Sequence, residues 1–208
     1  MQCPACLAPL ETPLGCKACG TLHSVPAPDP FEVLGLPLAY PVDTDDLRRR
    51  LLRFSRMMHP DYFAAAAPEQ RALAERNSAE LNRAHEILSD DARRADWLVT
   101  RLGGPSESEQ RQMPQEFLME VIEWNETLDA ARGARPGSSE RAALDALEST
   151  LRTAREETLA DIAGGLTPLP EPGSAALSDS RKQLNGLRYL NKTLNEIAAL
   201  RLAEATSR

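Results

Sequence analysis

The stretch Met57-Met58-His59-Pro60-Asp61-Tyr62-Phe63 decides the fold of this 208-residue chain, because it separates two helical patterns. Ahead of it, apolar residues recur at spacings of four, three and four, the period of a helix with one buried face: Leu47, Leu51, Phe54 and Met58. Pro60 lacks an amide hydrogen and pushes His59 out of helical geometry, so the helix is expected to end there. His59-Pro60-Asp61 is therefore predicted to lie in a loop.

A helical hairpin is predicted from the segments on both sides of this loop. Asp43-Thr44-Asp45-Asp46 supplies oxygens that can cap the first helix, and another face of that helix carries arginines: Arg48, Arg49, Arg50, Arg53 and Arg56. The second helix is expected from Pro68 to about Leu88, with this inward face: Leu73, Asn77, Leu81, Ala84 and Leu88. Facing apolar stripes make the pair an antiparallel hairpin. A short helix from Ala92 to about Leu102 follows, and Gly103-Gly104-Pro105-Ser106 marks a domain boundary.

Three more amphipathic helices are predicted in the second half of the chain. Their apolar positions are Phe117, Leu118, Val121, Ile122 and Leu128, then Leu144, Leu147, Leu151, Ala154, Leu159 and Ile162, and then Leu184, Leu187, Leu190, Leu194, Ile197 and Leu200. The connecting loops, 133–139 and 164–174, suit an antiparallel three-helix bundle. Aromatic residues make up only 4% of the chain, which favours helices over sheets. The predicted fold class is therefore all-α.

Four cysteines lie within the first 19 residues as two Cys-x-x-Cys pairs: Cys3 with Cys6, and Cys16 with Cys19. Each pair can form a tight turn, and together they supply four thiolates in tetrahedral geometry. Gly15 and Gly20 are expected at turns that need a positive φ. Structural zinc is the preferred interpretation, iron is the metal alternative, and a redox-active pair or free thiols stay open. Four thiolates leave no open coordination position, so neither a catalytic metal nor His23 as a ligand is expected.

Composition and charge narrow the class of protein. Charged residues make up 26% and hydrophobic residues 42%, as in a soluble globular chain. A formal net charge of −7 argues against broad attraction to nucleic acid or anionic membrane. No apolar run approaches the roughly 18–20 residues that span a bilayer, and Met1-Gln2-Cys3-Pro4 lacks the pattern of a signal or transit peptide. We therefore expect a cytoplasmic protein without nucleic-acid or membrane partners.

The His59-Pro60-Asp61 loop has the features of a docking site. It holds one histidine, without a nucleophile or second carboxylate paired with it in sequence, so a nuclease or hydrolase site is not expected. The arginine face offers positive charge to an acidic partner, Asp61 offers a carboxylate to a basic one, and Pro60 fixes the turn between them. The alternative is a solvated arginine face beside an incidental tripeptide.

Several of these segments together resemble a known family. Phe31-Glu32-Val33-Leu34-Gly35-Leu36, the basic helix, His59-Pro60-Asp61 and Ala84-His85-Glu86-Ile87-Leu88-Ser89-Asp90 resemble a J-domain. Phe117-Leu118-Met119-Glu120 and Leu187-Arg188-Tyr189-Leu190 resemble the C-terminal bundle of HscB-type J-protein co-chaperones of iron–sulfur cluster assembly. The resemblance covers about residues 29 to 204. The four-cysteine segment is similar to that of mitochondrial-type members, and Tyr62 replaces the lysine that often follows the tripeptide.

The resemblance implies three domains and a non-enzymatic role. The domains are a four-cysteine metal-binding segment at 1–28, a J-domain at 29–103 and a scaffold-binding bundle at 104–208. In this family the J-domain docks on a heat-shock chaperone ATPase of the HscA/DnaK class and stimulates its ATP hydrolysis. The implied chaperone-binding residues are Arg48, Arg49, Arg50, Arg53, Arg56, His59, Pro60 and Asp61.

The implied partner of the C-terminal bundle is an IscU-like iron–sulfur scaffold protein, which the co-chaperone delivers to the chaperone. The matching positions are Leu118, Met119, Ile122, Glu123, Glu126 and Tyr189. Ala130 stands where the family often has a further polar contact.

Several alternatives stay open at the level of sequence. Leu118 and Ile122 could pack inside the bundle while Phe117 and Val121 face out, and Tyr189 could be a half-buried core aromatic. The function could instead be thiol or metal handling by the Cys-x-x-Cys pairs. A third possible class is a zinc-ribbon protein that binds nucleic acid. The scarcity of basic residues in the cysteine segment argues against it. A homodimer is also left open.

Overall fold

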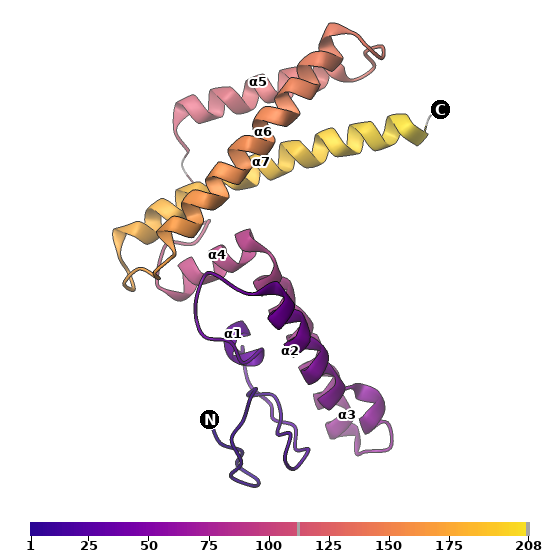
Figure 1. Cartoon of the computed structure of the whole chain (residues 1–208), viewed down its shortest axis with the longest axis vertical. Coiled ribbons are helices and arrows are strands. Elements are labelled where there is room, and N and C mark those ends of the chain that lie inside the picture. Colours follow the sequence, from indigo (N-terminus) through magenta and orange to yellow (C-terminus); the bar gives the residue numbers. More distant parts are fainter. Residues whose placement is uncertain (112, 207–208) are drawn as a thin grey trace. The chain divides into compact units, whose positions relative to one another are not determined.

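Helices account for nearly all the regular structure of the chain (Figure 1). The computed structural model describes residues 1–111 and 113–206, and these residues form seven α-helices, one 3-10 turn and a few isolated β-bridges without a strand. The chain divides into two compact units, Met1–Trp97 and Leu98–Arg208. Among the described helices, none is both long enough and apolar enough to span a membrane. The predicted all-α fold class is confirmed.

The first unit is built on the predicted hairpin. In α2 (Thr44–Met57) the Asp43 carboxylate accepts hydrogen bonds from the amides of Asp45 and Asp46 at 2.9 and 3.0 Å. The helix ends at Met58, after which Pro60 opens the 3-10 turn η1 (Pro60–Phe63). Helix α3 (Pro68–Ser89) then packs along α2 (Figure 1). The buried side chains between them are mostly the predicted ones: Leu47, Phe54, Met58, Ala74, Asn77, Leu81, Ala84 and Leu88.

Two further helical segments pack near the hairpin. Helix α1 (Pro30–Val33) places Phe31 against Trp97 of α4 (Asp91–Arg101), with ring centroids 5.4 Å apart. The buried guanidinium of Arg94 donates hydrogen bonds to the backbone oxygens of Tyr40 at 2.7 Å and Leu88 at 2.5 Å. It also lies 4.8 Å from the centre of the Tyr40 ring. These contacts offset the cost of burying the positive charge of Arg94.

The cysteine segment (residues 1–28) packs against the hairpin through backbone contacts. The side-chain amide of Asn77, which is 1% exposed, donates to the Leu14 oxygen at 2.8 Å and the His23 oxygen at 3.1 Å. These two carbonyls flank the second cysteine pair in sequence. A surface ion pair joins Glu11 to Arg53 at 2.7 Å. An asparagine on the inward face of α3 therefore holds a segment that has too few apolar residues for a core of its own.

Of the two glycines predicted to have a positive φ in this segment, only one has it. Gly20 has φ +74°, as expected for a turn that disfavours other residues. Gly15 is not among the residues with positive φ, so that prediction was wrong. A Cβ at Gly15 would lie 3.2 Å from the Leu22 side chain. Gly15 is therefore favoured by lack of space and not by its backbone angle.

The second unit is the predicted three-helix bundle. Helix α6 (Ser139–Gly165) packs against both α5 (Gln115–Ala131) and α7 (Ala175–Thr206) (Figure 1). The core residues come from all three helices: Leu128, Ala131, Leu144, Leu151, Leu190 and Ile197. Helix α5 contributes Leu128 and Ala131, which lie near its C-terminal end, to this core. Other faces of α5 are exposed to solvent.

Asn77→Ala is expected to lower the free energy of unfolding by about 2 kcal/mol, because it leaves two carbonyls without their donor. The control is Asn82→Ala, an exposed residue of the same helix, for which a change within about 0.5 kcal/mol is expected. Urea denaturation followed by circular dichroism measures both. Equal losses for the two variants would contradict the proposed role of the Asn77 contacts.

Candidate functional site

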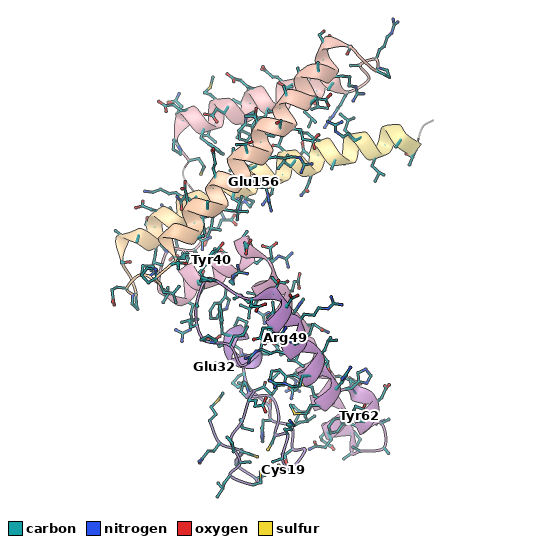
Figure 2. The ribbon with its side chains drawn as sticks, in the orientation of Figure 1. Cys19, Glu32, Tyr40, Arg49, Tyr62 and Glu156 are labelled. Atoms are coloured by element: carbon teal, nitrogen blue, oxygen red, sulfur yellow. The ribbon has the colours of Figure 1, made fainter. Side chains whose placement is uncertain are left out.

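The His59-Pro60-Asp61 loop is exposed at one end of the hairpin. The side chains of His59 and Asp61 are 54% and 88% exposed, and Tyr62 beside them is 74% exposed (Figure 2). The rings of His59 and Tyr62 meet edge to face with centroids 6.2 Å apart. The loop thus presents an imidazole, a carboxylate and a phenol to solvent from a single turn.

Local hydrogen bonds fix the backbone of this loop. The amide of Asp61 donates to His59 Nδ1 at 3.3 Å, and the amide of Tyr62 donates to the His59 oxygen at 3.0 Å. On α3, the hydroxyl of Ser78 donates to the Met58 oxygen at 3.2 Å. These contacts hold the turn while the Asp61 carboxylate stays at the surface, which is the arrangement of a recognition element.

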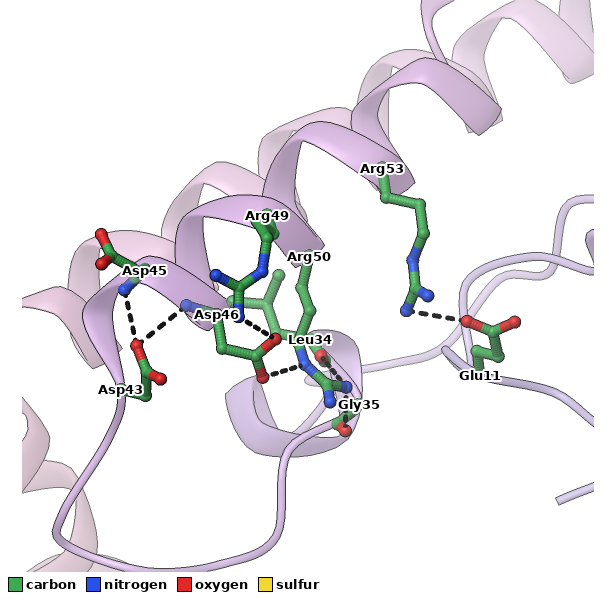
Figure 3. Close-up of polar contacts among 9 residues, drawn as sticks. All are labelled: Glu11, Leu34, Gly35, Asp43, Asp45, Asp46, Arg49, Arg50 and Arg53. Atoms are coloured by element: carbon green, nitrogen blue, oxygen red, sulfur yellow. Dashed lines mark hydrogen bonds and ion pairs between the residues drawn. The ribbon is translucent and has the colours of Figure 1, made fainter.

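Three arginines of α2, Arg49, Arg50 and Arg53, have partners within the first unit (Figure 3). Arg50 donates to Asp46 at 2.6 Å and to the backbone oxygen of Gly35 at 2.5 Å, so it ties α2 to the turn after α1. Arg53 is half-exposed and pairs with Glu11 of the cysteine segment. Arg49 is largely exposed and pairs with Asp46 at 3.2 Å. The hydrogen bond from Arg50, aided by Arg49, lowers the pKa of the Asp46 carboxyl.

The remaining two arginines, Arg48 and Arg56, are exposed. Among the predicted docking residues, the structure therefore brings Arg56 near the loop end of α2 and Arg48 near its start, while Arg50 and Arg53 already serve contacts within the unit. The sequence pattern could not separate these classes, because the partners of Arg50 and Arg53 lie in segments far away in sequence.

The four cysteines converge on one point. Their Sγ atoms all lie within 4.8 Å of one another, with Cys3 to Cys19 at 3.7 Å and Cys6 to Cys16 at 3.6 Å. A tetrahedral site with metal–sulfur bonds of about 2.3 Å separates its sulfurs by about 3.8 Å. All four are free thiols, far beyond the roughly 2.05 Å of a disulfide. The geometry fits a metal ion held by the four predicted ligands.

Polar groups around the cluster act on its thiols. The Thr21 hydroxyl and backbone amide lower the pKa of Cys19 to about 6. At Cys6 the Ala8 amide lowers the pKa, but the contact with the Cys19 thiol, burial and the other thiols together raise it to about 12. His23 Nε2 lies 3.7 Å from Cys3 Sγ, outside the four sulfurs. A metal ion would bind these sulfurs as thiolates, and His23 lies beside one of the four ligands, Cys3.

Helix α5 carries the predicted scaffold-binding positions on its exposed side. Leu118, Met119 and Ile122 are 41%, 53% and 50% exposed. Glu123 and Glu126 are exposed on the same helix. Leu118 and Ile122 therefore face solvent, and the alternative that buried them in the bundle is wrong. Three exposed apolar side chains within two helical turns form a small patch flanked by acids.

An aromatic cluster lies beneath this patch. Phe117 meets Trp124 and Tyr189 edge to face, both at 5.7 Å between ring centroids. Phe117, Val121 and Tyr189 are each partly buried. Tyr189 of α7 therefore contacts α5 through Phe117, as a half-buried aromatic. The sequence analysis missed Trp124, whose signal was its place seven residues after Phe117 on the same helical face.

Comparison with known proteins agrees with these features. The family model described as the HSCB C-terminal oligomerisation domain matches residues 113–198. Two solved structures share the fold. The crystal structure of human co-chaperone protein HscB has a TM-score of 0.75 and 23% identity, and covers 96% of this chain and 98% of its own. Chaperone HscB from Vibrio cholerae has a TM-score of 0.68 and 25% identity, and covers 83% of this chain and 97% of its own.

Curated relatives extend the similarity along most of the sequence. The co-chaperone protein HscB homolog of Bordetella petrii is 33% identical over 178 residues, which are 85% of this chain and 98% of that protein. The homolog of Vibrio cholerae is 29% identical over 168 residues, 80% of this chain and 93% of that protein. The predicted family resemblance is confirmed, and the chain belongs to the HscB family of co-chaperones.

Proposed function

We propose that this protein is a non-catalytic co-chaperone that stimulates an HscA/DnaK-class ATPase and delivers an IscU-like iron–sulfur scaffold protein to it. The observation that carries the proposal is the exposed His59-Pro60-Asp61 turn at the end of a basic helix, in a chain of the HscB family. The turn has a fixed backbone and accessible polar groups, which suits recognition of another protein. The partners are expected in the cytoplasm.

Charge supports the chaperone-docking half of the proposal. Arg48, Arg49 and Arg56 lie exposed on α2, within a chain whose net charge is −7. A local positive patch on an acidic protein directs an acidic partner to that patch and repels it elsewhere. Arg50 and Arg53 contribute by holding α2 to the segments beside it.

The α5 patch supports the scaffold-docking half. Exposed apolar side chains at the centre of a contact supply most of the binding free energy, and charges at its rim supply orientation. Leu118, Met119 and Ile122 are placed to be such anchors, with Glu123 and Glu126 offering carboxylates to a basic rim on the scaffold. Tyr189 would act through the packing of Phe117. A homodimer through the same unit is the competing use of this patch.

The four-cysteine site is proposed to hold one structural zinc ion. Cys3, Cys6, Cys16 and Cys19 supply four sulfurs at tetrahedral spacing, so no position is left for a substrate. When bound, the ion supplies cross-links that a segment of this size needs in place of a hydrophobic core. We retain the division into segments 1–28, 29–103 and 104–208 as part of the proposal.

His59→Gln and Asp61→Asn are each expected to reduce stimulation of the chaperone ATPase by about tenfold or more, because they remove groups at the docking turn. The measurement is single-turnover ATP hydrolysis by an HscA/DnaK-class chaperone, with and without the scaffold protein. His85→Gln, at a half-buried histidine near the C-terminal end of α3, is the control and should keep native stimulation. Undiminished stimulation by both loop variants would refute the proposed function.

A variant with Leu118→Ser, Met119→Ser and Ile122→Ser is expected to bind the scaffold protein about 10- to 100-fold more weakly, because it removes the apolar anchors. Circular dichroism should be unchanged, since all three side chains are exposed. Leu202→Ser, at a 67% exposed leucine of α7, is the control. Calorimetric titration with the scaffold gives the affinities. Native affinity in the triple variant would exclude this patch as the scaffold site.

Elemental analysis of the purified protein is expected to find one zinc per chain, and none in the Cys3→Ser, Cys6→Ser double variant. Iron in place of zinc would overturn the choice of metal. The same double variant separates the co-chaperone from a thiol-based function. ATPase stimulation that is retained at saturating concentrations of this variant, together with its loss in His59→Gln, excludes the cysteines as the active element.

A further inference from the structure

A groove of about 310 Å³ lies between the cysteine segment and α2. Its lining is mainly apolar, with Pro9 from the segment and Phe54 and Met57 from the helix. The charged residues along it are Glu11, Lys17, Arg53 and Arg56. This volume is at the lower end of the range for sites that bind small ligands or single anchoring side chains, roughly 300 to 1,000 Å³.

Both walls of the groove are held by specific contacts. The Asn77 amide fixes the segment through the Leu14 and His23 oxygens. The ion pair of Glu11 with Arg53 crosses between the walls at 2.7 Å. Next to it, a Cβ at Gly35 would lie 2.6 Å from the Glu11 oxygen, so the two backbones approach as closely as a glycine permits. The groove is therefore a built feature of the unit.

The charged residues that line the groove indicate which kind of ligand it suits. Arg53 is paired with Glu11, which leaves the positive charges of Lys17 and Arg56 in excess. Lys17 comes from the segment and Arg56 from α2, so the excess charge lies on both walls. An apolar lining with unmatched cations suits an extended acidic peptide that carries one apolar side chain.

The position of the groove near the His59-Pro60-Asp61 loop indicates which partner it suits. Arg56 lines it and lies three residues before His59, about one turn of α2 from the docking loop. A protein that covers the loop therefore also reaches the groove. Neither wall alone would form this surface, because the segment supplies Pro9 and Lys17 and the helix supplies Met57 and Arg56.

We propose that this groove binds an acidic, extended segment of the chaperone ATPase that the His59-Pro60-Asp61 loop engages, with Lys17 as a partner-selecting residue. The inference rests on the proposed function and adds a second contact to it. It gives the cysteine segment a direct part in partner recognition, beyond its stabilisation of the unit. Metal binding then matters to docking because the ion sets the position of Lys17 between Cys16 and Cys19.

The test is Lys17→Glu in the full-length, metal-loaded protein, titrated against an HscA/DnaK-class chaperone by fluorescence anisotropy at low and physiological salt. Lys17→Glu should weaken binding about 5- to 10-fold at physiological salt, and more at low salt, because it reverses a charge at the contact. Lys192→Glu, the same change in the second unit, is the matched control and should bind like the native protein. Metal content should be native in both variants.

Carbodiimide cross-linking provides a second measurement, because it joins a lysine amine to a carboxylate in direct contact. A Lys17 cross-link to a peptide of the chaperone is expected. The inference is overturned if Lys17→Glu binds as tightly as native, if no such cross-link forms, or if both lysine variants weaken binding equally.

His59→Gln, titrated in parallel, separates this inference from the proposed function. If His59→Gln loses ATPase stimulation while Lys17→Glu binds normally, only the groove is refuted. If His59→Gln and Asp61→Asn both keep native ATPase stimulation, the proposed function fails, and the groove inference fails with it.

Discussion

The cysteine segment cannot bury a core of its own, and this constraint shapes the first unit. Its stability must come from outside, through cross-links at four sulfurs and through the surface of the hairpin. Asn77 attaches the segment to the surface of the hairpin, because its side-chain amide donates hydrogen bonds to two backbone carbonyls of the segment. A polar residue on the inward face of α3 would cost stability without these partners. With them, it becomes a contact that fixes the segment in one register against α2 and α3.

The hairpin itself was predictable because its signals are local. The spacing of Leu47, Phe54 and Met58, the cap at Asp43 and the break at Pro60 each act within a few residues, and the structure has all of them. The clustering of four cysteines was predictable for a related reason, since ligand spacing within each pair is set by a short turn. The family resemblance then added the meaning of the loop and of the α5 positions, which spacing alone left open.

What the sequence could not supply were contacts between distant segments. Five arginines in nine residues form one pattern, yet Arg50 bonds the Gly35 oxygen and Arg53 pairs with Glu11. Helical periodicity likewise allowed either side of α5 to be buried. In the structure, the partly buried Phe117 contacts Trp124 and Tyr189, and Leu118 and Ile122 are exposed to solvent. The groove beside Lys17 depends on the same kind of long-range placement, and no local pattern indicates it.

The division of the arginines has a consequence for how function can be separated from folding. The loop side chains His59 and Asp61 are exposed, so substitutions there are expected to leave the fold intact and, under the proposed function, to alter recognition. Under the proposed function, Arg50 and Arg53 combine docking charge with structural contacts, because each bridges α2 to another segment. Loss of activity on their substitution would combine weaker docking with a displaced neighbour, which is the turn after α1 for Arg50 and the cysteine segment for Arg53. Under the proposed function, Arg48, Arg49 and Arg56 report on docking charge more directly, and Arg56 also lines the groove. On that proposal, the basic face of α2 is both part of the docking surface and part of what holds that surface together.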